Sequence, residues 1–272
     1  MEKKELLKEY KDYNINLSNI NLIIEFFEPG KMANSMIEYD DEDIKINNNK
    51  IEQKPGKKEK NGFSLFKKSN KVTVRGNGNT VISGNFINGV PMDENIQKEK
   101  HKPLKLYLNA ASFYDFIISN SVGDILIKNN MFDAIKREEN GSVKVTTNVG
   151  DVDIRCCEFD NINIKGSTSD ITLEDVICKN DTDIKTSTGD ISLESVELDS
   201  LNAKSSTGDI EINHSEVKSG KAQTSTGDVN TYNSDFIDTI GLYSSTGDIR
   251  LRNTTYDKER TLIKTFGSII ER

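Results

Sequence analysis

Apolar and polar residues alternate through the second half of the chain, and the alternation recurs at an almost constant spacing. A glycine, or Ser169 in one repeat, is taken as position zero; positions two and four are then aliphatic with few exceptions, and the residue between them is mostly polar. Position nine is apolar again, and a fourth apolar column follows it. Alternation with a period of two is typical of strands with one buried face. Four inward columns in each repeat therefore predict a parallel β-solenoid, in which every repeat forms one coil.

A short phrase, Gly-Asp followed by an aliphatic residue, opens most of these repeats. After a first step of 27 residues, successive copies lie 19 or 20 residues apart, and the full string Ser-Thr-Gly-Asp occurs four times. Glycine tolerates a positive φ and so allows a tight corner. Aspartate can accept hydrogen bonds from backbone N–H groups, and we expect each one to hold the corner of its own coil. The predicted structural corner column consists of Gly123, Asp124, Gly150, Asp151, Asp170, Gly189, Asp190, Gly208, Asp209, Gly227, Asp228, Gly247 and Asp248.

The aspartates of this column also suggest a cation site. If the coils are in register, the carboxylates form a row at the strand spacing of about 4.8 Å, and like charges at that distance repel one another. Calcium would satisfy such a row with oxygen ligands. The nine-residue calcium repeat Gly-Gly-x-Gly-x-Asp does not occur in the sequence. Hydrogen bonding to backbone amides is therefore the favoured interpretation, and no metal site is predicted.

The first 119 residues are less regular. Because terminal repeats of solenoids are usually atypical, we predict that residues 1–119 form an irregular, β-rich N-terminal cap and residues 120–272 the regular repeats. The predicted fold class is all-β: a single-stranded, right-handed parallel β-helix with coils of 19–20 residues. Within the cap we expect strands around residues 14–27, 43–47, 71–75, 80–83, 104–108 and 113–119, a short helix over 2–10, and surface loops over 52–70 and 89–103.

The charge and the apolar content of the chain limit the partners and the cellular location that can be expected. The formal net charge of −8 argues against a nucleic-acid partner. Apolar residues make up 34% of the chain, which is enough for the thin core of a solenoid. No apolar segment reaches the length of a membrane span, and the first residues lack the apolar stretch of a secretory signal. These features predict a cytoplasmic protein.

No arrangement of residues in the sequence points to catalysis or to a cofactor. Cys178 falls in an apolar column and is expected in the core, while Cys156 and Cys157 are adjacent, so neither a disulfide framework nor a metal centre is predicted. Acidic residues recur with the repeat, and the sequence contains no Gly-x-Ser-x-Gly, phosphate-loop or dinucleotide fingerprint. We therefore expect a non-enzymatic protein without a cofactor. A carbohydrate-binding or polysaccharide-active β-helix is the alternative.

The lysine-rich segment at residues 52–70 contains the string Gly-Phe-Ser-Leu-Phe-Lys-Lys. Aromatic and basic residues side by side are typical of a segment that touches a membrane surface. The alternative is a loop whose two phenylalanines pack against the end of the solenoid. The candidate membrane contact comprises Phe63, Leu65, Phe66, Lys67 and Lys68.

The phrase Ser-Thr-Gly-Asp-Ile/Val-x-Leu at this spacing, after a less regular strand-rich segment, resembles the repeats of a bacterial family catalogued as "putative adhesins". The resemblance covers roughly residues 70–272. It implies a β-solenoid that serves as a scaffold or interaction module linked to the cell envelope, with a protein or envelope partner not yet identified. It also makes the cell surface the alternative location, and it assigns no catalytic residue.

The last coil stops at residues 269–272 without a capping segment, which leaves strand edges and apolar core uncovered. Weak end-to-end self-association is predicted on that ground.

Overall fold

The computed structural model describes residues 3–7, 11–27, 35–39, 43–54, 86–87, 90–91, 102–110, 114–129 and 140–272. The chain divides into two compact units, one made of residues 1–54 and 102–272 and the other of residues 55–101. In the second unit the described residues form one antiparallel pair, β7 (Phe86–Ile87) with β8 (Val90–Pro91). Every regular element of the described residues is a strand. The all-β prediction is therefore confirmed.

The short helix expected over residues 2–10 is wrong. Lys3–Leu7 form strand β1, which pairs antiparallel with β4 (Ser35–Tyr39). A helix of this length is marginal on its own, whereas pairing with β4 gives the backbone groups of the segment hydrogen-bond partners. The Tyr39 hydroxyl adds a hydrogen bond of 2.5 Å to the Glu5 carboxylate across the same pair.

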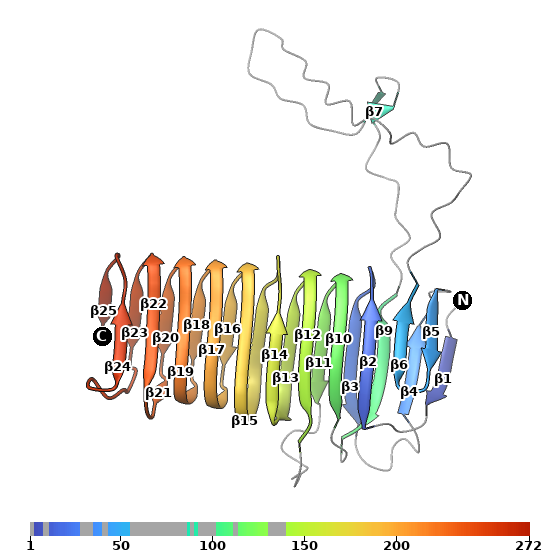
Figure 1. Ribbon diagram of the computed structural model, residues 1–272, viewed down its shortest axis with the longest axis horizontal. Coiled ribbons are helices and arrows are strands. Elements are labelled where there is room, and N and C mark those ends of the chain that lie inside the picture. The colour runs from blue at the N-terminus through green and yellow to red at the C-terminus, as the bar shows by residue number, and fades with distance from the viewer. Residues whose placement is uncertain are drawn as a thin grey trace. The chain divides into compact units, whose positions relative to one another are not determined.

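Three stacks of strands run along the first unit (Figure 1). Stack A consists of β6 (Lys50–Gln53), β2 (Asp12–Leu17), β10 (Asp115–Val122), β12 (Ser142–Val149), β14 (Asn161–Lys165), the later parts of β15 (Ile171–Thr188), β17 (Glu197–Thr207) and β19 (Glu216–Thr226), then β22 (Ile240–Thr246) and β24 (Thr261–Lys264). Stack B consists of β9 (Leu104–Asn109), β3 (Leu22–Phe27), β11 (Ile125–Asn129), β13 (Val152–Phe159), the first part of β15, β16 (Ile191–Glu194), β18 (Ile210–Asn213), β20 (Val229–Tyr232), β23 (Ile249–Arg252) and β25 (Ile269–Glu271). Stack C is short and joins the end of β13, the middle of β15, the starts of β17 and β19, and β21 (Asp235–Phe236).

The apolar columns lie in register and form the core. In stack B, Ile191 pairs with Ile171 on one side and with Ile210 on the other; in stack A, Ala203 pairs with Ile184. All five side chains have no exposed area. Burying an isoleucine side chain contributes about 1.5–3 kcal/mol relative to exposure. The predicted inward positions are therefore the positions that hold the coils together.

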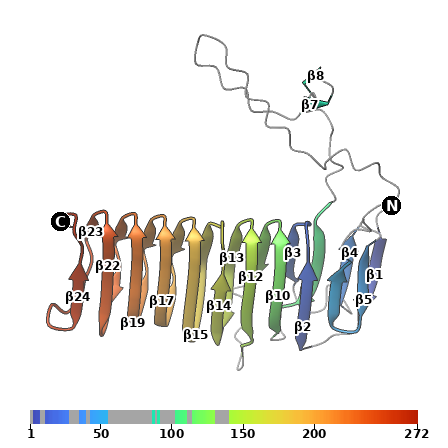
Figure 2. The ribbon, with the colours of Figure 1, turned by 45° about the horizontal axis from the view of Figure 1, so that its top comes forward.

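The N-terminal strands do not stack in chain order. β2 lies between β6 and β10, and β3 lies between β9 and β11. The coil that contains β2 and β3 is thus interior, although it comes early in the chain (Figure 2). Outside it, β4 pairs antiparallel with β9, and β5 (Ile44–Asn47) pairs antiparallel with β6. These antiparallel strands end the parallel stacking on this side.

The expected strand over residues 14–27 is two strands, β2 and β3, separated by a corner at residues 18–21. The strands expected over 43–47, 104–108 and 113–119 correspond to β5, β9 and β10. The pair expected over 71–75 and 80–83 lies outside the described residues.

Candidate functional site

The glycines of the corner column lie where stack A turns into stack B. All six have a positive φ, between 124° and 145°, a range that glycine adopts without strain. At Gly208 a side chain would also meet the carbonyl oxygen of Gly189 at 2.2 Å. The corner therefore needs glycine for two reasons, the backbone conformation and the close approach of the neighbouring coil.

Each aspartate of the column bonds the next one along the stack. Its Oδ1 atom accepts a hydrogen bond from the backbone N–H of the aspartate in the following coil, at 2.7–3.1 Å. The row begins at Asn21, whose Oδ1 accepts from the Asp124 amide, and it ends at Ser268, whose amide donates to Asp248. We call this row the aspartate ladder. The expectation that each aspartate holds its own corner needs correction, because stacking in register brings the carboxylate to the amide of the next coil.

The hydrogen bonds of the aspartate ladder also offset the repulsion between stacked carboxylates. One oxygen of each carboxylate is bonded to an amide N–H, and a charge-assisted hydrogen bond of this kind stabilises the negative charge. Within the part of the chain that the structure describes, no group of three or more His, Cys, Asp or Glu side chains is arranged to hold a metal ion. What the geometry shows at these corners is a link between coils.

A second set of hydrogen bonds at this corner was not predicted. Ser205 and Thr224 are fully buried, and their hydroxyl groups donate to the carbonyl oxygens of Gly189 and Gly208 in the preceding coil, at 3.0 and 2.8 Å. The signal in the sequence is a small polar residue three positions before the corner, in a row that is otherwise apolar. It occurs at Asn120, Thr147, Thr186, Ser205, Thr224 and Ser244.

The corner between stacks B and C has a left-handed backbone. The residues concerned lie six positions after the start of each repeat and have φ of 48–54°: Cys156, Asp175, Ser195, His214, Asn233 and Asn253. Asparagine and aspartate tolerate this conformation better than most residues. The Asn233 amide approaches Nε2 of His214 at 3.0 Å, and Nδ1 of His214 lies 2.8 Å from the Glu194 carboxylate.

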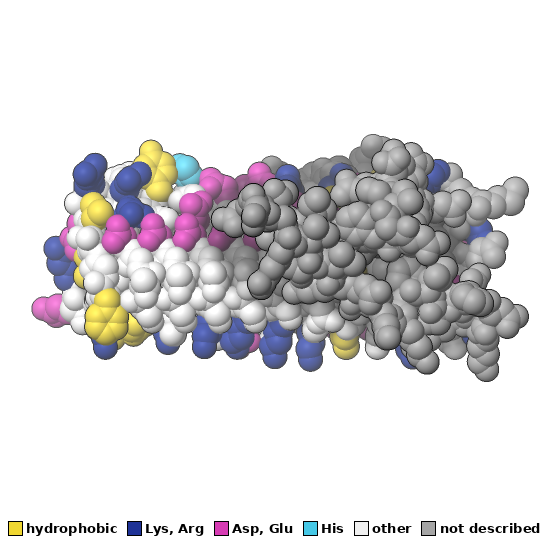
Figure 3. Space-filling view, turned by 90° about the horizontal axis from the view of Figure 1, so that it is seen from above, with side chains coloured by type: hydrophobic (Ala, Val, Ile, Leu, Met, Phe, Trp, Pro, Cys, Tyr) yellow, Lys and Arg dark blue, Asp and Glu magenta, His cyan; other side chains and the backbone are white. Residues whose placement is uncertain are grey.

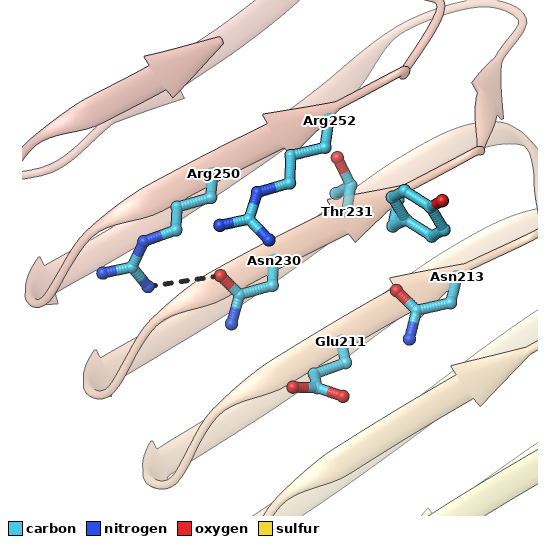
Figure 4. Close-up of a pocket in the computed structure, with 7 residues that line it drawn as sticks. Glu211, Asn213, Asn230, Thr231, Arg250 and Arg252 are labelled. Atoms are coloured by element: carbon cyan, nitrogen blue, oxygen red, sulfur yellow. Dashed lines mark hydrogen bonds between the residues drawn. The ribbon is translucent and has the colours of Figure 1, made fainter. Parts of the chain in front are cut away.

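An open groove of about 430 Å³ lies beside this corner, over strands β18, β20 and β23 of stack B (Figure 4). In the two coils before β18 the equivalent outward positions hold Thr172, Glu174, Ser192 and Glu194, which are small or acidic. Larger outward side chains, Tyr232, Arg250 and Arg252, follow in the coils that form the groove. Its lining is Glu211, Asn213, Asn230, Thr231, Tyr232, Arg250 and Arg252.

Arg250 is fixed at the edge of the groove by two carboxylates of the aspartate ladder. Its guanidinium group bonds Asp228, lies 2.6 Å from the Asp248 carboxylate and reaches Oδ1 of Asn230 at 3.4 Å. Burial acts to raise the pKa of Asp228, but hydrogen bonds from Arg250 and from the Asp248 amide, together with the charge of Arg250, outweigh it and leave the pKa below its usual value. The bond to Asp228 likewise raises the pKa of Arg250.

Tyr232 gives the groove an aromatic surface. The residue is 46% exposed, and its ring meets His214 edge-on with the ring centroids 5.3 Å apart. The amides of Asn213 and Asn230 and the guanidinium group of Arg252 flank it. An exposed ring beside amide and guanidinium donors can bind a polar ligand by stacking and hydrogen bonds.

Two of the three cysteines lie in the core. Cys157 and Cys178 are buried, as expected for Cys178, and Cys156 is half-buried. Burial raises the pKa of the Cys178 thiol, which disfavours the reactive thiolate. The candidate membrane contact at Phe63, Leu65, Phe66, Lys67 and Lys68 lies outside the described residues.

An all-β chain whose repeats stack in parallel, with hydrogen bonds that recur at every corner, defines a repeat protein of the β-solenoid-like class. The chain belongs to the Toastrack DUF4097 family, whose sequence model matches residues 32–268. Within the described ranges we find no helix with the length and apolar character needed to cross a membrane.

Two solved structures are similar to this chain. One is described as a "putative lipid binding protein" from Parabacteroides distasonis; it has a TM-score of 0.51 and 15% identity, and the match covers 100% of this chain and 93% of that one. The other is described as a "putative cell adhesion protein" from Clostridium sporogenes; it has a TM-score of 0.39 and 13% identity, over 85% of this chain and 98% of that one. At these identities the likeness concerns the fold alone. No curated protein matches the chain.

Proposed function

We propose that the protein is a non-enzymatic interaction module of the adhesin type, which serves as a scaffold at or near the cell envelope. In this proposal it is a right-handed parallel β-helix with coils of 19–20 residues, capped by residues 1–119 and extended by the repeats of residues 120–272. Its outer faces hold side chains at fixed spacing, as the extended surfaces of other repeat proteins do.

The aspartate ladder is the observation that carries this proposal. General acid–base catalysis by carboxylates needs groups that are free to exchange protons at a reacting centre. Here the acidic residues of the repeat are bonded to amides of the next coil, from Asp124 to Asp248. The aspartates that recur with the repeat thus support the stacking of coils. The variable outward residues are then the ones that can recognise a partner.

Carbohydrate binding is the second candidate, and the groove on stack B favours it. Tyr232 offers a ring face, while Asn213, Asn230 and Arg252 offer donors and acceptors suited to hydroxyl groups. A shallow, open groove along a strand stack matches an extended chain of sugars better than a compact ligand.

A glycan array with the full chain and two variants separates the candidates. Carbohydrate binding predicts that Tyr232→Ala loses at least about tenfold in affinity, while Tyr243→Ala, which removes an outward tyrosine from stack A, binds as the unchanged protein does. A scaffold without a glycan ligand gives no signal above background for any of the three. New reducing ends released from a polysaccharide panel would contradict the non-enzymatic proposal.

Location and assembly need separate experiments. Protease treatment of intact cells distinguishes a surface protein, which is degraded, from a cytoplasmic one, which is protected. Weak end-to-end self-association stays a prediction, and light scattering that shows a monomer at high protein concentration would contradict it.

A further inference from the structure

Five lysines gather on the outer face of stack A. Lys165, Lys185 and Lys204 are direct neighbours in register, and Lys144 and Lys221 belong to the adjacent outward column. Basic side chains form a row along the lower edge of Figure 3, below the acidic row of the aspartate ladder. We call these five residues the lysine face.

The lysine face carries an excess of positive charge. The two outward columns that hold these lysines have ten positions between β12 and β19, and only Asp183 among the ten is acidic; Asp181 lies in the next outward column. Lys185 pairs with Asp183 at 2.7 Å. Among the described residues, Lys144, Lys165 and Lys204 have no acidic partner. The remaining positions hold Thr146, Asn163, Asn202 and Gln223.

Folding alone does not account for these lysines. Like charges directly opposite one another in neighbouring strands are destabilising, and a strand spacing of about 4.8 Å lies well inside the Debye length at physiological salt. The same column accepts Thr146 before the three lysines and Gln223 after them. An anionic partner would offset the repulsion that the stack itself leaves in place.

The other two strand stacks carry outward charges of both signs. Outward positions of stack B include Glu174, Glu194 and Glu211. Its basic residues Lys128, Arg155 and Arg250 are each paired with a carboxylate, and Arg252 lies in the groove. Outward positions of stack C include Glu197, Glu216 and Asp235. Although the chain has a net charge of −8, the lysine face is basic, and an extended anionic surface would orient the molecule with stack A toward it.

We propose that the lysine face binds the surface of a lipid bilayer that carries anionic headgroups. Lysine is a flexible, hydrated point charge, which suits laterally mobile headgroups better than a fixed bidentate site. Charges in two rows across several coils match a broad surface. Proteins that bind single-stranded nucleic acid add aromatic rings for base stacking, whereas the ten positions contain none and the ring of nearby Tyr243 lies under Lys221, 4.7 Å from the ammonium group.

Vesicle co-sedimentation of the full chain tests this proposal. The protein is expected to bind mixed phosphatidylglycerol–phosphatidylcholine vesicles at low ionic strength, to leave them at high ionic strength, and not to bind phosphatidylcholine alone. The variant Lys165→Gln, Lys185→Gln, Lys204→Gln is expected to bind on the order of 10–100-fold more weakly. Replacing the same three residues by arginine is expected to preserve binding.

A matched control removes three lysines elsewhere: Lys128→Gln, Lys179→Gln and Lys218→Gln, which pair with Glu25, Glu158 and Asp199. It has the same net charge as the first variant and is expected to bind anionic vesicles as the unchanged protein does. Unchanged melting temperatures show that both variants fold. Equal losses in both variants would overturn the proposal, as would the absence of binding at low ionic strength. Binding to single-stranded DNA as tight as to anionic vesicles would overturn the assignment to a bilayer.

Discussion

The carboxylate of Asp209 accepts a hydrogen bond from the backbone amide of Asp228, one coil further along the stack, at 2.7 Å. The amide of Asp209 in turn donates to Asp190 in the preceding coil at 2.8 Å. Each aspartate is therefore both a donor through its backbone and an acceptor through its side chain. The ladder joins successive coils at the corner between stacks A and B.

Asp209→Ala removes one link of the ladder and leaves the Asp228 amide without its acceptor. We expect the free energy of unfolding to fall by about 1–2 kcal/mol. Asp209→Asn is expected to cost much less, because Asn21 already accepts the same bond from the Asp124 amide through its Oδ1 atom. Urea denaturation of the three proteins measures both differences. An asparagine variant as unstable as the alanine variant would show that the negative charge matters and the acceptor atom does not.

Gly208→Ala tests the corner itself. The residue has φ of 141°, and a Cβ atom there would lie 2.2 Å from the carbonyl oxygen of Gly189. We expect a loss of about 3 kcal/mol or more, because the substitution adds both backbone strain and a clash with main chain that cannot move aside. The nearby outward variant Ser206→Ala is the control and is expected to stay within about 0.5 kcal/mol. Thermal denaturation is the measurement, and equal melting temperatures would contradict the role assigned to the glycine.

The sequence was informative wherever a residue's role is set by its own coil. Ile191 and Ile210 were placed in the core by alternation alone, since one face of each strand is buried whatever lies above or below it. Gly208 was placed at a corner because glycine tolerates a positive φ, which is also a property of the residue within its own coil. The hydrogen bond that the Asp209 carboxylate accepts from the Asp228 amide joins two coils, whereas the sequence predicts a bond within one coil. It depends on the register between repeats, which a single repeat does not encode.

Two further features depend on how coils come together in space. The position of β2 between β6 and β10 could not be predicted, since its alternation is the same whichever strands lie beside it. Glu211, Asn230 and Arg250, which line the groove, come from three successive coils. Outward positions are not constrained by the core, and only the stacked structure shows that these three are neighbours.

Thr224→Val removes a buried hydroxyl group and keeps the volume of the side chain. The carbonyl oxygen of Gly208, which is half-buried, then loses a donor at 2.8 Å that came from a fully buried side chain. We expect a loss of about 1–3 kcal/mol in the free energy of unfolding. Thr224→Ser keeps the hydroxyl group, as Ser205 and Ser244 do at the equivalent positions, and is expected to recover most of the stability. Urea denaturation checks the order of the three proteins, and a valine variant as stable as the unchanged protein would contradict it.

The contact between Arg250 and Asp228 predicts a dependence of stability on pH. The pKa of Asp228 in the folded protein lies below the ordinary value of 3.8. A carboxylate with a lowered pKa contributes stability above its unfolded pKa and loses that contribution as the pH falls through the folded pKa. Arg250→Gln should therefore lower the melting temperature at neutral pH, and only slightly, because the pair is partly exposed and solvent screens it. Below about pH 4 the difference from the unchanged protein should shrink toward zero.

Arg252→Gln is the control for this comparison. It removes the same charge from the same groove, but from a side chain that has no ion pair with any described residue. Its effect on the melting temperature should be small and should not follow the titration of Asp228. Melting curves of the three proteins from neutral pH to below the ordinary carboxylate pKa make the test. A difference for Arg250→Gln that persists unchanged in acid would show that the guanidinium group stabilises the corner by packing, because the carboxylate would by then be protonated.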